Sequence, residues 1–456
     1  SMAESIDVAV VCCGAPKRGM GWYHCKQLLE GRVAGARLSD IVEPFFMGAG
    51  KDTPLAKEFQ EWSDTLSGVA VHASIEDSPA IAGSKLVIIC GRTADNPKLF
   101  KAAIDHGFTH IYLEKPGAPS VAELEEMSAY ASSKGVPVFM GYNRNFSKYI
   151  LAANEAAKDK SDYTLTLGRN DCFNTPESVD ECFERNAEGM MKNMMVHELV
   201  TLITYHGLTV SGIDKIEANR ELTTLETRRG FTDFSKVGFS ITTKAGKEFI
   251  LWGDRSNGEY GEAVIKEDGM EVFKAIRPDD EITAKSKELV EACPGCMPYF
   301  YLQDAEYLAV KQAVIDFIGG KSGKPEGVAG IDTAIESVKL CDHITESLMA
   351  VLNEPGKPAA KPRGRPKGKG KAKAGQQPRQ EAGGPAHFEE LLRALPLERL
   401  LLETDGPYMC PNPFRGQTAH PGHVHRVAER IAEVKAVPLA EVMAATRASS
   451  RTVYGI

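Results

Sequence analysis

Short, continuous apolar runs alternate with helical patterns along the first third of the chain. The helical patterns carry apolar residues three and four positions apart, as in Met20–Leu29, Pro97–His106 and Val121–Lys134. Runs that are apolar throughout indicate strands buried on both faces, and their alternation with helices predicts a parallel, doubly wound α/β sheet. The expected strands are Ile6–Cys13, Arg37–Val42, Val69–His72, Leu86–Cys90, His110–Leu113 and Val136–Met140.

The pattern changes after about residue 149, where apolar and polar positions alternate. Apolar residues occupy every second position in 237–241 and 249–251, on either side of a turn at Lys244–Gly246, and a second hairpin is indicated around Asp268-Gly269. Alternation of this kind is typical of strands with one buried face, so an antiparallel sheet covered by helices on one side is expected. Helical patterns at 304–318 and 331–352 close this part of the chain.

These changes divide the chain into four parts. Residues 1–148 are expected to form the parallel-sheet domain, and residues 149–354 an α+β domain with an open, mostly antiparallel sheet. Residues 355–386 are rich in Lys, Pro, Gly, Ala and Gln and offer nothing to a core, so a disordered basic linker is predicted. Residues 387–456 return to globular texture as a short C-terminal α/β fragment, which is small for a core of its own.

The net charge of −8 conceals an asymmetry. The linker carries nine Lys and Arg and one acid, a balance of +8, which leaves −16 on the remainder because the total is −8. An acidic globular body gives no reason to expect nucleic acid as its ligand. No apolar run is long enough to span a bilayer and no signal-peptide pattern precedes the first strand, so a cytoplasmic protein without membrane contact is expected.

The ten cysteines show no disulfide framework. Several fall in expected buried strands, which indicates a reducing compartment. Cys293-Pro-Gly-Cys296 has the spacing of redox pairs, but no second pair completes a zinc site. The preferred interpretation is a Pro-Gly turn between two free thiols, with a disulfide or metal role as the alternative.

A glycine-rich turn follows the first strand and leads into a helix. Glycines let the backbone approach a pyrophosphate, and the N–H groups and positive end of the helix hold it. The spacing is looser than G-x-G-x-x-G, so a glycine-rich turn without a ligand is the alternative. The expected cofactor contacts in this turn are Gly14, Ala15, Lys17, Arg18, Gly19, Met20 and Gly21.

Glu43 stands at the end of the second strand. An acid at this place typically binds the adenosine ribose hydroxyls, which favours NAD and repels the extra phosphate of NADP. Lys17 and Arg18 could offset that repulsion, so NAD is predicted and NADP is left open. The alternative for Glu43 is a solvated acid at a strand end.

Glu114-Lys115-Pro116 lies where the strand His110–Leu113 meets the helix Val121–Lys134. A lysine at the carboxyl end of a parallel strand lies on the edge where α/β sheets bind ligands. There it can act as a general acid or base once its surroundings lower its pKa. The alternative is a surface lysine next to a proline.

This tripeptide in this place, behind a glycine-rich turn, resembles the signature of the Gfo/Idh/MocA family of nicotinamide-dependent oxidoreductases. The resemblance extends over roughly residues 5–350 and implies a Rossmann dinucleotide-binding domain followed by a domain for substrate binding and oligomerisation. It implies that Lys115 lies beside the nicotinamide, and that cofactor contacts extend beyond the glycine turn. The further contacts implied are Glu43, Gly91, Arg92, Asn96, Glu114, Lys115 and Asn143.

The family's second signature is a helix of the form D-x-x-x-H, which the stretch Lys192–Glu198 matches except at its first position. Residues four apart share a helix face, so Asn193, His197 and Thr201 are expected to face the cleft together. The resemblance implies that Lys115 and His197 handle the proton and that Asn193 orients the substrate.

Two departures from the family's pattern leave two functions open. Asn193 stands where an acid is usual, and Asn96 where a histidine is usual; an amide can orient a hydroxyl but cannot exchange a proton. The expected function is an NAD(P)-dependent dehydrogenase or reductase that transfers a hydride to or from a small polar substrate such as a sugar, polyol or imine. The alternative is a catalytically altered NAD-binding regulator that its basic, AT-hook-like linker tethers to DNA. A homodimer or tetramer is implied by the resemblance.

Two further resemblances lie in the C-terminal quarter. Lys361–Lys369 resembles an AT-hook, whose Arg-Gly-Arg-Pro core suits the narrow minor groove of A/T-rich DNA, so weak DNA contact or nuclear import is the alternative to a plain basic linker. The tail from about Leu397 resembles the carboxyl end of TatD-type metal-dependent deoxyribonucleases, in which the counterpart of Asp405 contacts a metal pair. The other ligands have no counterpart here, so neither a metal site nor nuclease activity is expected.

Overall fold

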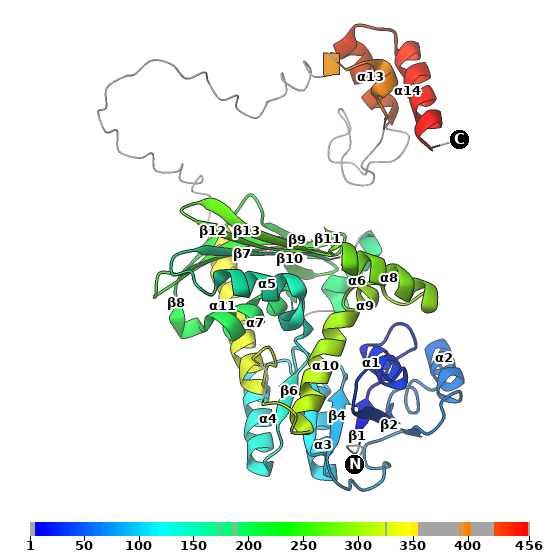
Figure 1. Ribbon diagram of the computed structural model, residues 1–456, viewed down its shortest axis with the longest axis vertical. Coiled ribbons are helices and arrows are strands. Elements are labelled where there is room, and N and C mark those ends of the chain that lie inside the picture. The colour runs from blue at the N-terminus through cyan, green and yellow to red at the C-terminus, as the bar shows by residue number, and fades with distance from the viewer. Residues whose placement is uncertain are drawn as a thin grey trace. The chain divides into compact units, whose positions relative to one another are not determined.

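The computed structural model describes residues 5–171, 173, 175–185, 189–323, 326–353, 392–393, 395–402 and 424–454. The chain forms two compact units, residues 1–359 and residues 360–456 (Figure 1). The predicted linker 355–386, its AT-hook-like stretch and Asp405 lie outside the described residues.

The first sheet has six strands in the order β3-β2-β1-β4-β5-β6, and all neighbouring pairs are parallel. This is the doubly wound Rossmann arrangement, so the predicted fold class of this part is confirmed. The strands are β1 (Ile6–Val11), β2 (Ala36–Val42), β3 (Ala70–His72), β4 (Lys85–Ile89), β5 (His110–Leu113) and β6 (Val138–Met140). The helices are α1 (Met20–Leu29), α2 (Pro54–Ser63), α3 (Asn96–His106) and α4 (Val121–Lys134).

The strands of the first sheet are apolar throughout because both faces of the sheet are buried. Val8 and Val10 of β1 pack into one apolar cluster, while Ala9 and Val11 pack into the other. Successive side chains point to opposite faces of a strand, so both faces of this sheet are buried. The chain reverses its winding between β1 and β4, and the crevice at their carboxyl ends is where such sheets bind ligands.

The second sheet has the order β13-β12-β7-β11-β10-β8, with β9 paired to β10. Only the β7–β11 pair is parallel, so the predicted open, mostly antiparallel sheet is confirmed. Its strands are β7 (Thr164–Asp171), β8 (Ile213–Ala218), β9 (Thr224–Arg228), β10 (Phe231–Thr243), β11 (Glu248–Asn257), β12 (Tyr260–Glu267) and β13 (Met270–Arg277).

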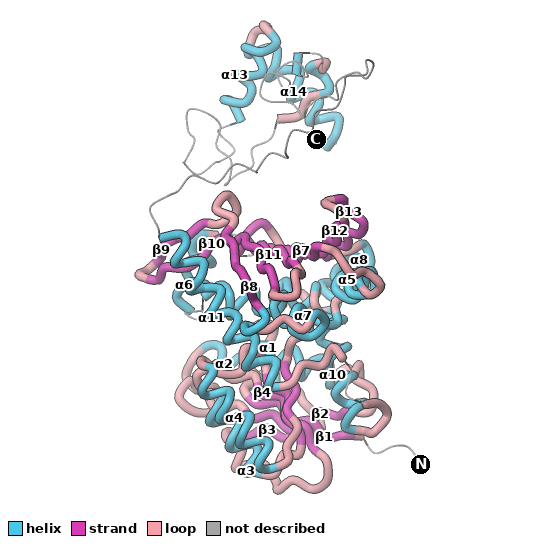
Figure 2. Tube along the Cα trace, turned by 90° about the vertical axis from the view of Figure 1, so that its left-hand side faces the viewer, coloured by secondary structure: helices cyan, strands magenta, loops and turns pink. Residues whose placement is uncertain are grey.

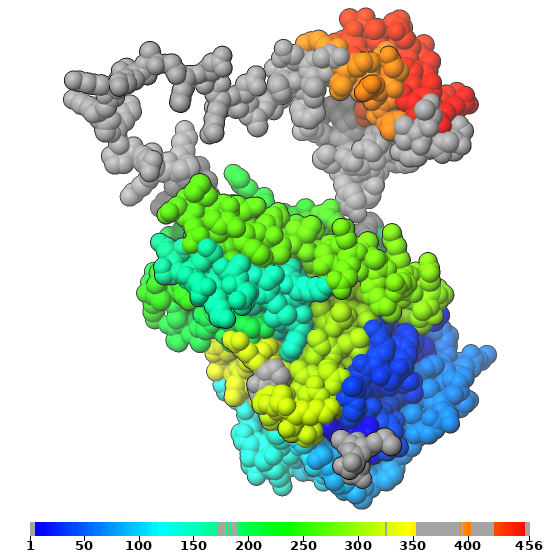
Figure 3. All heavy atoms as spheres, in the orientation of Figure 1, coloured from blue at the N-terminus to red at the C-terminus, as the bar shows by residue number. Residues whose placement is uncertain are grey.

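Helices fill the space between the two sheets, and Figures 1 and 2 both place α7 and α11 there. In Figure 3 α1, in dark blue, and α10, in yellow-green, form one continuous surface. The helices of this part are α5 (Lys148–Ala157), α6 (Pro176–Arg185), α7 (Val196–His206), α8 (Asp280–Ala292), α9 (Pro298–Leu302), α10 (Asp304–Ile318) and α11 (Ile331–Asn353). Shorter turns are η1 (Asn143–Phe146), η2 (Met191–Met195) and η3 (Val210–Gly212).

The described residues of the second unit form η4 (Leu397–Arg399), α13 (Val424–Lys435) and α14 (Leu439–Tyr454). They share a small apolar cluster centred on Ala428, Ile431, Ala432 and Val442. None of the helices in the described ranges combines the length and the apolar composition that crossing a bilayer requires.

Candidate active site

The turn between β1 and α1 is so close that side chains have no room at its key positions. Gly14 lies in the left-handed region, with φ of +74°. A Cβ on Gly19 would lie 2.5 Å from the carbonyl oxygen of Cys13, and one on Gly21 would lie 2.6 Å from that of Cys12. Gly19 is also the N-cap of α1, which therefore begins without a capping side chain. A tight turn that ends at a bare helix N-terminus is the cradle that a pyrophosphate needs.

The other residues of this turn have distinct places. The carbonyl of Ala15 accepts from the backbone N–H groups of Arg18, at 3.2 Å, and Gly19, at 2.8 Å, which closes the turn on itself. Lys17 has φ of +67°. Its ammonium donates to the carbonyl of Pro294 at 2.8 Å, so the structure directs this cation to the α8–α9 connection.

Glu43 is only 3% exposed and ties the end of β2 to the glycine turn. Its carboxylate accepts from the N–H groups of Gly14, at 2.8 Å, and Phe45, at 3.2 Å. Burial raises the pKa of this carboxyl, while the backbone N–H groups oppose that shift. Across the crevice, Arg92 from the end of β4 lies 5.8 Å from the Phe45 ring centroid. Glu43 thus stands beside the first glycine, where the predicted ribose contact requires an acid.

The segment after β4 presents a buried acceptor. Asn96 is 2% exposed, and its Nδ2 donates to the carbonyl of Gly117 at 3.0 Å. Its Oδ1 is buried without a hydrogen-bond partner, and a Cβ on Gly91 would come within 2.7 Å of that oxygen. Buried polar atoms are rarely left unpaired, so this oxygen fits contact with a ligand or a water.

Lys115 lies at the carboxyl end of β5. Its side chain reaches the second half of the first unit, residues 1–359, called the main unit below. Its Nζ donates to the backbone carbonyl of Asn193 at 2.9 Å. The peptide bond to Pro116 is cis. The lysine and the second signature, 78 positions apart in the sequence, therefore meet at one place.

The second signature departs from the α-helix that its sequence predicts. Met191–Met195 forms a π-helical turn, and α7 begins only at Val196. A π turn changes which carbonyls bond within the helix, and such turns are frequent at functional sites. Here the carbonyls of Asn193 and Met194 accept from two cations, Lys115 and Arg169, the latter at 3.0 Å.

This geometry alters the role of Asn193. A π turn precedes α7, so Asn193 lies outside the regular α-helix that holds His197 and Thr201, and the shared cleft face stays a prediction. Thr201 is 1% exposed, and its hydroxyl donates to the Asn145 side chain at 3.3 Å. The contact with Lys115 is made by the Asn193 backbone, so it does not depend on an acid at this position.

His197 is a buried, neutral imidazole. It is 5% exposed, and its ring lies edge-on to Tyr142 at 6.1 Å between centroids. Burial lowers the pKa of His197 well below its usual value, and the nearby cations of Lys115 and Arg169 lower it further. Its Nδ1 is buried without a hydrogen-bond partner. A neutral ring with an open nitrogen can exchange a hydrogen bond or a proton with a bound molecule.

Arg169 also belongs to this site. It lies on β7, is 6% exposed, and donates to the carbonyl of Met194. Its Nε is buried without a hydrogen-bond partner, as is Nδ1 of His197. The site therefore offers a bound molecule a second unpaired nitrogen, and this one is a donor. No local motif marks this arginine, because its contact depends on the π turn.

A buried polar chain lies behind Lys115 and was not expected from the sequence. Glu114 Oε1 lies 2.9 Å from His24 Nε2, and Lys311 Nζ lies 2.9 Å from His24 Nδ1. Lys311 also donates to Gln27 at 2.6 Å. Because a carboxylate can only accept, the neutral His24 ring donates from Nε2 to Glu114 and accepts at Nδ1 from Lys311. Burial lowers the pKa of Lys311 to about 7. The chain thus fixes the carboxylate of Glu114, the residue directly before Lys115.

The same chain predicts sensitivity to acid. Burial, and then the charge of Lys311, lowers the pKa of His24 to about 4. In the unfolded chain the histidine takes up a proton near pH 6.5, whereas in the folded protein it does so only near pH 4. The folded protein therefore keeps its full stability above about pH 6.5 and loses stability as the pH falls toward 4. We expect His24 alone to reduce the free energy of unfolding by about 3 kcal/mol between pH 7 and pH 4.

Urea denaturation at several pH values checks this expectation. His24→Gln should flatten the pH dependence. An unaltered slope in His24→Gln would show that the acid sensitivity has another source.

Asn143, a predicted cofactor contact, also takes part in a buried network. It is 1% exposed, and its Nδ2 donates to Gln303 at 3.0 Å and Glu306 at 3.1 Å. Glu306 in turn accepts from Arg277 at 2.9 Å, and Arg277 donates to Glu259 at 3.0 Å. The structure therefore places Asn143 in a buried network that joins η1 to the second sheet.

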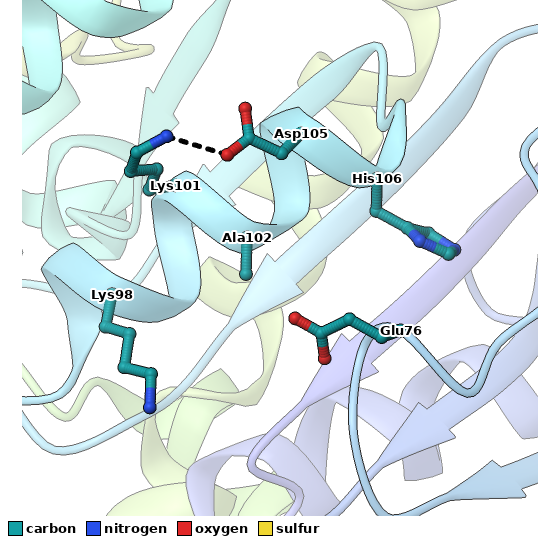
Figure 4. A pocket seen from close by; sticks show the side chains of 6 residues that line it. All are labelled: Glu76, Lys98, Lys101, Ala102, Asp105 and His106. Atoms are coloured by element: carbon teal, nitrogen blue, oxygen red, sulfur yellow. Dashed lines mark hydrogen bonds and ion pairs between the residues drawn. The ribbon is translucent and has the colours of Figure 1, made fainter.

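A hollow of about 380 Å³ lies on the outer side of α3 (Figure 4). Lys98, Lys101, Asp105 and Glu76 line it, and Lys101 is paired with Asp105 at 2.7 Å. It lies along α3 and away from Lys115, so it is not part of the candidate site. In the ranges that the structure describes, no three His, Cys, Asp or Glu side chains gather so as to hold a metal ion.

Two protein families match separate parts of the chain. Residues 51–142 match the model of an oxidoreductase family with an NAD-binding Rossmann fold, Gfo/Idh/MocA. Residues 383–455 match the model of TatD related DNases. The resemblances to these two families are confirmed, and the first supports NAD as the cofactor.

Curated relatives resemble only short stretches. The chain is 38% identical over 80 residues to YabD of Bacillus subtilis, an uncharacterised metal-dependent hydrolase, which is 16% of this chain and 31% of YabD. It is 40% identical over 70 residues to the human 3'-5' RNA nuclease TATDN2, 15% of this chain and 9% of that protein. The chain thus spans less than a third of the length of these relatives.

Solved structures share the fold of the main unit. Scyllo-inositol dehydrogenase of Lactobacillus casei, with bound NAD(H) and scyllo-inositol, aligns with a TM-score of 0.58 and 14% identity over 76% of this chain and 98% of that chain. Myo-inositol 2-dehydrogenase of Lactobacillus plantarum aligns with a TM-score of 0.57 and 15% identity over 76% and 98%. At these identities the likeness concerns the fold.

Proposed function

We propose that the main unit binds NAD and catalyses hydride transfer to or from a carbon that bears a hydroxyl or an imine nitrogen in a small polar substrate. The observation that carries the proposal is the position of Lys115, at the carboxyl end of β5 and beside a neutral His197 whose Nδ1 has no partner. The glycine turn occupies the same edge of the same sheet.

The residues present fit a pyridine dinucleotide. The glycine turn and the N-terminus of α1 would hold the pyrophosphate through backbone N–H groups. Glu43, buried next to Gly14, would accept from the ribose hydroxyls, which disfavours a 2′-phosphate. Asn96 and Gly91 would line the nicotinamide side of the crevice. A bound nicotinamide supplies the hydride acceptor or donor that no side chain offers.

The chain's own residues would handle the proton and the orientation. Lys115 would hold or release the proton at the substrate oxygen or nitrogen, held in place by the Asn193 carbonyl. The unpaired Nδ1 of His197 would accept from a second substrate group, because the ring is neutral. Arg169 would donate from its unpaired Nε. These groups suit a polyol, a sugar or a related amine, and inositols belong among the candidates because the aligned structures act on them.

Assembly and the C-terminal quarter belong to the same proposal. The parallel-sheet domain would cover residues 1–148 and the substrate domain residues 149–354. The edge strand β13 exposes Met270, Val272 and Ile276, which are 69%, 46% and 47% exposed, so pairing of subunits through this sheet is favoured. The basic linker would add at most weak DNA contact, and no metal-dependent activity is proposed for the tail.

Titration of the full chain with NAD⁺, NADH, NADP⁺ and NADPH tests the cofactor, and a screen of polyols, inositols, sugars and amino sugars tests the reaction. We expect NAD⁺ to bind at least about tenfold more tightly than NADP⁺, which corresponds to roughly 1.4 kcal/mol. Absence of binding to any of the four would refute the proposal. Binding of NAD⁺ without turnover of any substrate would favour the alternative, a cofactor-binding regulator.

A further inference from the structure

The Cys293-Pro-Gly-Cys296 turn lies against the glycine turn of the candidate cofactor site. Cys293 caps the end of α8, and the two thiols are free, with their sulfurs 3.4 Å apart. Gly295 has φ of +84°, which brings the chain round so that both cysteines point to the same side. Formation of an S–S bond requires a closure of about 1.3 Å, to roughly 2.05 Å.

Two hydrogen bonds connect this thiol turn to Lys17. The ammonium of Lys17 donates to the carbonyl of Pro294 at 2.8 Å, and the N–H of Met297 donates to the carbonyl of Lys17 at 3.0 Å. Lys17 is the non-glycine residue with positive φ at the centre of the glycine turn, so its backbone position sets the path of that turn. A shift within the thiol turn therefore reaches the predicted pyrophosphate site through two direct contacts.

The thiol turn is also anchored to α1. The Tyr301 hydroxyl accepts from the N–H of Cys296 at 2.9 Å and donates to the carbonyl of Cys293. The next residue back, Phe300, stacks on Tyr23 of α1, with centroids 4.4 Å apart and an interplanar angle of 2°. The helix whose N-terminus would hold the pyrophosphate thus packs on α9, which directly follows the thiol turn; α1 and α9 are neighbours in Figure 1.

We propose that Cys293 and Cys296 form a reversible disulfide that weakens the binding of the dinucleotide by the glycine turn. This inference rests on the proposed cofactor site. Cys293 is half-buried at an exposed turn, whereas Cys296 is 7% exposed. An incoming disulfide therefore meets Cys293 first. The second step is intramolecular and rests on the 3.4 Å separation of the two sulfurs, because burial raises the pKa of the Cys296 thiol to about 11 and leaves little of it as thiolate near neutral pH.

The oxidant is a low-molecular-weight disulfide of the glutathione type. The Cys293 thiolate attacks one of its sulfurs, breaks its S–S bond and releases one thiol. The Cys296 thiolate then attacks the Cys293 sulfur of the mixed disulfide and releases the second thiol. Two protein thiols are oxidised, one external disulfide is reduced to two thiols, and the two protons pass to those leaving groups.

Redox titration in glutathione buffers tests the inference with the full chain. Differential alkylation and peptide mass analysis should locate the new disulfide at Cys293–Cys296. The dissociation constant of NAD⁺ should rise about tenfold from the reduced to the oxidised protein. If the reduced protein binds NAD⁺ tenfold more tightly, thermodynamic linkage requires saturating NAD⁺ to favour the dithiol form. The midpoint potential of the thiol pair should then rise by about 30 mV, which is a tenfold change for a two-electron couple.

Matched variants separate this pair from the other cysteines. Cys293→Ser/Cys296→Ser should bind NAD⁺ like the reduced protein under all conditions, whereas Cys341→Ser, at a fully buried position on α11, should retain the redox response. Failure to form the disulfide, or an NAD⁺ affinity equal or higher after oxidation, would overturn this inference and leave the proposed function standing. Absence of NAD⁺ binding by the reduced protein would overturn both.

Discussion

Replacement of Lys115 by alanine is expected to lower turnover by about 10²–10⁴-fold, the range that a positioned acid or base contributes. The lysine ends β5, and its Nζ is held by the Asn193 carbonyl at 2.9 Å next to the neutral His197. Among the described residues, Lys115 is the cation of the parallel-sheet domain that donates to the Asn193 carbonyl. Another side chain could replace it only if the site rearranged. Steady-state rates on whichever substrate the screen identifies, together with NAD⁺ calorimetry, measure the effect.

The expected signature is a loss of turnover with nearly unchanged NAD⁺ affinity. The predicted pyrophosphate contacts come from the turn after β1, whereas Lys115 ends a different strand. Lys98→Ala, at an exposed position on α3, removes a positive charge without touching the site and should leave both quantities unchanged. Normal turnover in Lys115→Ala would remove this lysine from the mechanism, even if the cofactor binds as proposed.

The position of Lys115 could be predicted because topology alone fixes it. The strand His110–Leu113 and the helix Val121–Lys134 have the bounds that their apolar patterns predict. In a parallel sheet, whatever follows such a strand lies on the ligand-binding edge. The same logic placed Glu43 beside the glycine turn without any knowledge of its hydrogen bonds.

The π turn could not be predicted, because nothing in Met191–Met195 excludes an α-helix. The carbonyls that it presents are satisfied by Lys115 and Arg169, which come from different sheets. Local sequence carries no record of such distant partners. The missing acid at Asn193 therefore suggested a weakened site, while the structure shows that a backbone carbonyl makes the contact with the lysine.

The polar chain behind Glu114 escaped prediction for a related reason. Lys311 and His24 are 287 positions apart, and each lies on a helix whose pattern predicts only packing. A buried lysine is rare unless it is paired, and only the tertiary structure shows the pair. The thiol turn at Cys293–Cys296 was visible in the sequence, but its contact with Lys17 was not.

Replacement of Gly19 by alanine should weaken NAD⁺ binding by at least about 100-fold, or roughly 2.7 kcal/mol. Its Cβ would lie 2.5 Å from the carbonyl oxygen of Cys13 and 2.9 Å from the Cα of Gly14, and backbone atoms cannot swing aside as a flexible side chain can. The turn must open, which misdirects the backbone N–H groups of α1. Hydrogen bonds to a charged group contribute about 1.5–3 kcal/mol each, so loss of one or two accounts for the effect.

Gly323→Ala provides the matched control for this substitution. Its Cβ would meet nothing within 4 Å, so the same chemical change should alter neither NAD⁺ affinity nor the melting temperature. Circular dichroism of Gly19→Ala separates a folded protein with an open turn from an unfolded one. If the folded Gly19→Ala protein bound NAD⁺ as tightly as the parent, the dinucleotide could not lie on this turn. Lys115 would then stand beside a site of another kind.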